Sequence, residues 1–312
     1  MRADVILLAI APVFFVMALG YGAGRLGVVD NRQVGSLNTL VMSFALPASM
    51  FVATASAPRS EMLAQWPLVA LLGTVMLAVF LGWYLLAPAS RADASMQALT
   101  IAFPNFAGVG LPIAAAVAGP AGAVPVAVGL AAGSLLVSPL ALLLVEMNMP
   151  GRESAAAPGA RILAALRRSL TKPVVLAPAL GILLSLLRVP IGPVIEASLE
   201  LIGTAAAGVA LFLTGLILSG QAFRLDWRIV GATALADIVR PGVTALLVWM
   251  LPVPADIARM AILLAAVPSG FFGILFAVDY RLDSTAAGSM VLASSVLSIA
   301  TLGVVILVLF PH

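Results

Sequence analysis

Long apolar runs follow one another along the whole chain, with only short charged or turn-forming segments between them. A helix of about 20 apolar residues crosses a hydrocarbon core that is about 30 Å thick. Charged residues make up 9% of the 312 residues, whereas a soluble domain carries about 25%. The sequence therefore predicts a polytopic, all-α integral membrane protein that lies in a lipid bilayer.

The spacing of the apolar runs predicts an internal repeat. We expect ten membrane helices at residues 5–24, 34–54, 66–88, 96–119, 123–146, 171–188, 195–219, 229–251, 259–279 and 284–309. The first five, shifted by 164 residues, fall on the last five. Five is an odd number, so the two halves enter the membrane in opposite orientations, as inverted repeats do. The first repeat covers residues 1–146, a connecting loop 147–170, and the second repeat 171–312.

Two predicted helices are interrupted at corresponding positions of the two repeats. Pro104 and Pro268 are 164 residues apart, and both are followed by glycines. Paired interruptions of this kind indicate a transporter binding site near the membrane midplane. The residues of the two breaks are Pro104, Asn105, Gly108, Gly110 and Pro112 in the first, and Pro268, Ser269, Gly270 and Gly273 in the second.

The breaks favour an anionic ligand. Half-helix N-termini present free N–H groups and the positive end of the helix dipole, which suit a carboxylate. Asn105 adds an amide donor, and Ser269 is its counterpart, because 105 plus 164 is 269. An ordinary proline kink is the alternative for either break alone, and the shared offset favours the functional interpretation.

A charged pair, Asp237 and Arg240, lies in the middle of the eighth predicted span. A charge at this depth is costly and needs a partner inside the protein. Either the two form a structural ion pair, or Arg240 attracts the substrate and Asp237 carries a coupling proton. Ser43 and Thr214 are further candidates, which either line the substrate path or hydrogen-bond neighbouring helices.

The composition gives little support to a metal site, an enzyme or a nucleic-acid-binding protein. The chain has no cysteine, and its one histidine is the terminal His312, so we expect no metal site, no cofactor and no enzymatic activity. The net charge of +3 reflects membrane orientation rather than a nucleic-acid partner. One side of the predicted topology has eleven basic residues and the other side has four. The eleven are Arg25, Arg32, Arg91, Arg152, Arg161, Arg167, Arg168, Lys172, Arg224, Arg228 and Arg281. That side is expected to be cytoplasmic, with both termini outside the inner membrane.

Several segments resemble the auxin efflux carrier family, and most closely its bacterial malonate-transporter branch. They are residues 29–31, 37–38, 41–48, 104–113, 210–219 and 269–273. The resemblance implies an elevator fold with crossed fourth and ninth helices, similar to that of NhaA-type antiporters and bile-acid symporters. It also implies a scaffold of helices 1, 2, 6 and 7 that forms a homodimer, and a transport core of helices 3–5 and 8–10.

The resemblance also carries over one site residue. Asn105 matches the asparagine that contacts the substrate carboxylate in plant relatives. Pro268-Ser269-Gly270 departs from the second asparagine motif of those relatives, which favours a small carboxylate over auxin. We therefore expect a secondary carrier for malonate or a similar dicarboxylate, coupled to a proton or Na⁺. The alternatives are a cation/proton antiporter, which usually needs an acid at the break, and an auxin-like monocarboxylate carrier.

Overall fold

The computed structural model describes residues 2–30, 34–148, 159–160, 163–164, 167, 170–220, 224 and 226–310. Throughout these residues the regular elements are helices, and the extended pairing is an isolated bridge between Pro104 and Ser269. This confirms the predicted all-α class. The loop expected at 147–170 lies mostly outside the described residues.

The elements of the first half are helical segments joined by short turns. They are α1 (Arg2–Arg25), α2 (Val34–Leu40), η2 (Val41–Ala45), α3 (Leu46–Ala55), α4 (Arg59–Ala64), α5 (Trp66–Leu86), α6 (Arg91–Ala102), η3 (Phe106–Gly110), α7 (Leu111–Ala118), η4 (Gly119–Gly122) and α8 (Ala123–Asn148). Residues 103–105 separate α6 from η3, so the break predicted around Pro104 is present.

The second half is also a series of helical segments joined by short turns. Its elements are α10 (Pro173–Leu187), α11 (Pro193–Gly203), α12 (Ala205–Ser219), α13 (Trp227–Ala234), η5 (Leu235–Val239), α14 (Arg240–Met250), α15 (Ala255–Ala266), α16 (Phe272–Asp279) and α17 (Thr285–Leu309). Adding 164 to the bounds of α6, 91 and 102, gives 255 and 266, which are the bounds of α15. The helix that leads into each break is thus the same in both halves.

Six helical stretches of the described residues are long and apolar enough to cross a membrane. They are Val34–Ala55, Arg59–Leu86, Phe106–Asn148, Pro193–Ser219, Trp227–Met250 and Thr285–Leu309. The 12-residue helices α6 and α15 end at the breaks and are too short to cross alone. The chain is therefore a multi-pass membrane protein, and the number of ten crossings stays a prediction.

Three short π-helical segments each precede a proline that begins the next α-helix. Pro47, Pro112 and Pro241 stand two residues after the ends of η2, η3 and η5. Proline has no N–H to donate and its ring clashes with the carbonyl four residues earlier, so the helix widens by a residue at that point. The sequence analysis predicted no such segments.

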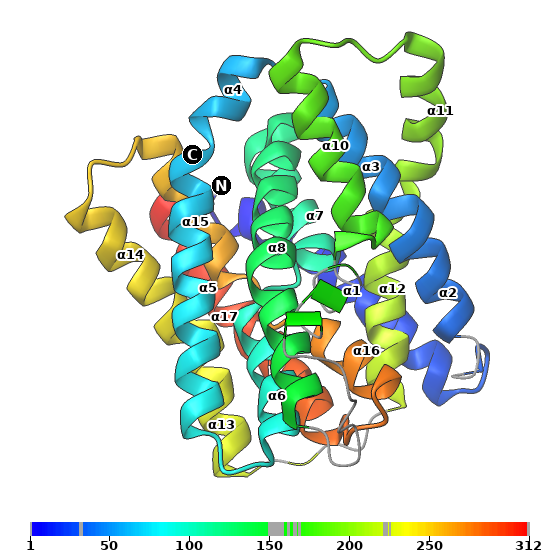
Figure 1. Ribbon diagram of the computed structural model, residues 1–312, viewed down its shortest axis with the longest axis vertical. Helices are drawn as coiled ribbons and strands as arrows, with labels where there is room; N and C mark the ends of the chain where they lie inside the picture. Colours follow the sequence, from blue (N-terminus) through cyan, green and yellow to red (C-terminus); the bar gives the residue numbers. More distant parts are fainter. Residues whose placement is uncertain are drawn as a thin grey trace.

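Close helix contacts depend on glycine at several positions, and the packed helices can be followed in Figure 1. α1 packs against α12, where a Cβ on Gly20 would lie 2.0 Å from the carbonyl oxygen of Phe212 and a Cβ on Gly215 would lie 1.8 Å from that of Met17. α3 packs against α10 and α11, while α5, α6 and α8 pack against one another. Small residues allow this approach in membrane proteins, where dispersion contacts replace the hydrophobic driving force.

Candidate functional site

The two breaks cross each other in the interior of the protein. The main-chain N–H of Asn105 donates to the carbonyl of Pro268 at 2.8 Å, and that of Gly270 donates to the carbonyl of Phe103 at 2.9 Å. Residues 101–111 and 265–274 are all buried. The breaks predicted from the offset therefore form one shared structure, in which each extended segment satisfies backbone groups of the other.

Gly270 allows this pairing. A Cβ at that position would lie 2.5 Å from the carbonyl oxygen of Phe103 and 3.3 Å from the carbonyl group of Pro104. Real Cβ atoms do not approach backbone so closely, so any side chain here would push the two segments apart. Gly273 has the same role one turn later, where a Cβ would lie 2.0 Å from Thr100 Oγ1.

Asn105 begins the helical segment that follows the first break. Its side-chain Oδ1 accepts from the N–H of Gly108 at 3.0 Å, and its carbonyl accepts from the N–H groups of Val109 and Gly110 at 2.9 Å each. These bonds use several N–H groups that were expected to be free for a ligand. The amide Nδ2 of Asn105 takes part in none of these bonds, so the donor left for a carboxylate is the side-chain nitrogen.

Ser269 is tied to the core through a serine that the sequence analysis did not select. The N–H of Ser269 donates to Ser294 Oγ at 2.8 Å, and Ser294 Oγ donates to Asp237 Oδ1 at 2.7 Å. Within the described part of the chain, Ser269 Oγ and Asp237 Oδ2 have no hydrogen-bond partner. One buried hydroxyl thus links the carboxylate to the crossover.

Arg240 holds the ends of both half-helices. Its side chain is fully buried, and Nε donates to the carbonyl of Ala265 at 2.9 Å, while Nη1 and Nη2 donate to the carbonyls of Ile101 and Val267. These carbonyls lie at the C-terminal ends of α6 and α15, where the helix dipole is negative. The contacts favour a structural role for Arg240, although in a form different from the expected pair with Asp237.

Ser43 and Thr214 lie away from these hydrogen bonds. Ser43 is half-buried in η2, and the buried Thr214 donates to the carbonyl of Ala210 within its own helix at 2.7 Å. α12 packs against η3, so Thr214 stands on a helix that borders the crossover. In the described residues neither hydroxyl hydrogen-bonds to Asn105 or Ser269.

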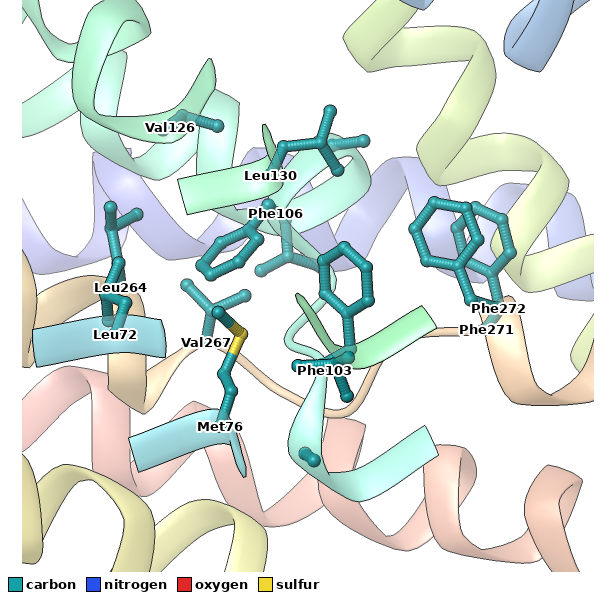
Figure 2. Close-up of a cluster of buried hydrophobic side chains, with 14 of the residues drawn as sticks. Leu72, Met76, Phe103, Phe106, Val126, Leu130, Leu264, Val267, Phe271 and Phe272 are labelled. Carbon is teal, nitrogen blue, oxygen red and sulfur yellow. The ribbon is translucent and has the colours of Figure 1, made fainter. Parts of the chain in front are cut away.

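Aromatic rings surround the crossover (Figure 2). Phe103 stacks on Phe272 with ring centroids 4.9 Å apart and meets Phe106 edge-on at 5.8 Å. Phe271 stacks on Phe272 at 5.6 Å. No function was predicted for these rings. They make the surroundings of Asn105 apolar, which strengthens any charge-assisted hydrogen bond formed there.

Comparison with known proteins gives the family. A family model described as membrane transport protein matches residues 5–306. This chain belongs to that family. The match covers nearly the whole chain and confirms the resemblance to auxin efflux carriers.

Two relatives are similar to this chain over most of its length and of their own. "Uncharacterized transporter YfdV" of Escherichia coli (strain K12) is 29% identical over 295 residues, which is 92% of this chain and 91% of the relative. "Putative malonate transporter" of Rhizobium meliloti (strain 1021) is 26% identical over 300 residues, which is 94% of this chain and 92% of the relative. The protein is therefore a membrane transporter and not an enzyme.

Proposed function

We propose that this transporter is a secondary active carrier for a small organic anion, with malonate or a similar dicarboxylate as substrate. The observation that carries the proposal is the crossover itself, where Asn105 presents a free amide between two half-helices. The relative from Rhizobium meliloti, whose name refers to malonate, supports the choice of substrate.

The charges around the crossover favour an anion over a cation. Residues 103–110 and 267–273 contain no acidic side chain. The half-helices that begin at Phe106 and Phe272 direct their positive ends toward the crossing segments. A carboxylate placed there would accept from Asn105 Nδ2, and from Ser269 Oγ once that hydroxyl turns toward it.

The burial of the crossover requires movement during transport. A substrate reaches Asn105 only if the surrounding helices separate, first toward one side of the membrane and then toward the other. We assign this movement to an elevator motion of helices α5–α8 and α13–α17 against α1–α3 and α10–α12. The latter group is also the proposed dimer surface. Glycines allow α1 to pack closely on α12 within that proposed scaffold.

A cation/proton antiporter is the second candidate function. The observation that favours it is Asp237, a carboxylate that is 1% exposed and has one oxygen without a partner among the described residues. In that case the ion would bind behind the crossover rather than at Asn105. An auxin-like monocarboxylate carrier is the third, and the apolar rings beside Asn105 favour it.

Binding and uptake measurements separate these candidates. Purified protein in vesicles should bind and accumulate labelled malonate, and excess acetate or indole-3-acetate should compete poorly. Asn105→Ala should abolish the uptake, while Asn148→Ala should not, because Asn148 is exposed at the end of α8 and bonds its own helix. Uptake that survives Asn105→Ala unchanged would overturn the assigned site, and cation exchange without malonate binding would favour the antiporter.

A further inference from the structure

A cavity of about 240 Å³ opens between the ends of α6, α13 and α17. Its lining includes Asp93, Arg224, Arg228, Ile229, Asp283 and Met290. The lining comes from three loops that the charge distribution places on one side of the membrane. Hydrogen bonds from the side chain and N–H of Thr285 lower the pKa of Asp283, so the rim carries charge of both signs at neutral pH. The cavity is therefore a polar, water-accessible space.

Two helices lead from this cavity to Asp237 in steps of one turn. Ile229 lines the cavity, Thr233 stands four residues deeper, and Asp237 four residues deeper again. On α17, Met290 lines the cavity and Ser294 follows four residues later. Residues four apart lie on one side of a helix. The cavity, Thr233, Asp237 and Ser294 are thus in line along the facing sides of α13–η5 and α17, which pack against each other.

The oxygens along this line lack hydrogen-bond partners. Thr233 Oγ1, Asp237 Oδ2 and Ser269 Oγ are buried and unpaired within the described residues. Buried polar atoms are nearly always satisfied by protein or water, so this row of three oxygens is left for a partner outside the described residues. The row joins the cavity to the crossover through Ser294, which bonds both Asp237 and the N–H of Ser269.

The charged groups around Asp237 favour a proton over a metal cation. Among the described residues of the elements packed against η5, Arg240 is the one deeply buried charge. The others stand near helix starts: Arg91 and Asp93 on α6, Arg228 on α13, and Asp256 and Arg259 on α15, while α17 carries none. A metal ion would need several oxygen ligands, and the carbonyls of Ile101, Ala265 and Val267 already accept from Arg240. A proton needs only Asp237 Oδ2.

We propose that protons reach Asp237 from this cavity past Thr233, and that Ser294 transmits the charge state of Asp237 to the crossover at Ser269. The ionised carboxylate orients the Ser294 hydroxyl as a donor, which leaves the Ser294 oxygen to accept from Ser269. A proton from cavity water that binds Oδ2 removes this charge and weakens the orientation. The crossover thereby becomes free to change its pairing. This inference rests on the proposed anion transport, to which the proton would be coupled.

Protonation can be tested without any substrate. Infrared spectra of wild-type protein in vesicles should show a carboxylic acid band that grows as the pH falls. The other carboxyl groups contribute to it, so the Asp237 band is the part of the absorption that Asp237→Asn removes. Thr233→Val should slow the appearance of this band after a pH jump, while Thr244→Val should not. Thr244 is an equally buried threonine of the same span whose hydroxyl bonds its own helix. A band that is unchanged in Asp237→Asn, or equally fast in Thr233→Val and wild type, would overturn the proposed route.

Coupling is tested by transport. An inward proton gradient should raise the initial rate of malonate uptake, and Ser294→Ala should move the pH midpoint of uptake upward, because the ionised Asp237 loses a donor. Ser298→Ala is the matched control, since this buried serine bonds the carbonyl of Ser295 on the same helix. An unshifted midpoint in Ser294→Ala would refute the relay, even if Asp237→Asn does not fold. Absence of malonate uptake, with the infrared band intact, would refute only the substrate.

Discussion

Arg240 and Ile101 are 139 residues apart in the sequence, and the guanidinium of the first donates to the carbonyl of the second inside the protein. The same side chain reaches the carbonyls of Ala265 and Val267 on the other repeat. One positive charge therefore sits against the negative ends of two half-helices. Without Arg240, the three carbonyls that it reaches would lose this donor in an apolar interior.

Arg240→Met should destabilise the protein more than it alters substrate recognition. Three carbonyls lose their donor, and a buried acceptor left unpaired costs about 1–3 kcal/mol. We expect the unfolding free energy to fall by about 3 kcal/mol or more, seen as a lower thermal midpoint in detergent. Arg240→Lys should restore part of it, because lysine keeps the charge without the planar fork. A Met variant as stable as wild type that no longer binds malonate would make Arg240 a substrate ligand.

Gly270→Ala should disrupt the crossover. The added methyl group would lie 2.5 Å from the carbonyl oxygen of Phe103, so the segments must separate. We expect a loss of stability of about 1–3 kcal/mol, as for other overpacked sites, together with loss of uptake. Gly82→Ala is the control, since a Cβ there meets nothing within 4 Å. Equal uptake by both variants would contradict the described pairing.

Asn105→Asp should distinguish the helix-capping role of this side chain from its proposed contact with the substrate. Aspartate caps a helix as well as asparagine does, so the bond to the N–H of Gly108 is retained. The variant loses the amide donor and adds a negative charge where the carboxylate is proposed to bind. Malonate affinity should fall at least tenfold, or about 1.4 kcal/mol, as measured by binding titration. Unchanged affinity would exclude contact between Asn105 and the substrate.

Single cysteines will test the orientation, because the chain has none of its own. Ser60, in the short helix α4, and Thr171, just before α10, are both exposed, and the charge distribution places them on opposite sides. A membrane-impermeant maleimide should label Ser60→Cys in intact cells, and label Thr171→Cys only after permeabilisation. The reverse pattern would invert the predicted topology, and labelling of both in intact cells would contradict the number of crossings between them.

The sequence predicted the two breaks better than the contacts between them. Apolar length and the offset of Pro104 from Pro268 were sufficient to locate α6 and α15, because both depend on local sequence. Ser294 could not be selected, since its role depends on Asp237 and Ser269, each more than 20 residues away along the chain. The carbonyl partners of Arg240 could not be predicted either, because every residue type has the same backbone carbonyl.

The π-segments had a local signal that was not used. Each π-segment is followed two residues later by a proline, in the pairs Leu46-Pro47, Leu111-Pro112 and Arg240-Pro241. Such pairs indicated a kink or a helix start, and periodicity alone does not distinguish either from a widened turn. The division into scaffold and core, the dimer and the ten crossings remain predictions, since they concern a membrane and a second copy of the chain.

The prolines of the crossover limit how far its two segments can associate. Neither Pro104 nor Pro268 has a main-chain N–H to donate to the other segment. The pairing therefore cannot lengthen into a sheet in either direction. What remains is a contact one or two bonds long, held from outside by Ser294 and Arg240. Such a joint acts as a pivot: the half-helices on either side can tilt about it while the polypeptide stays connected across the membrane.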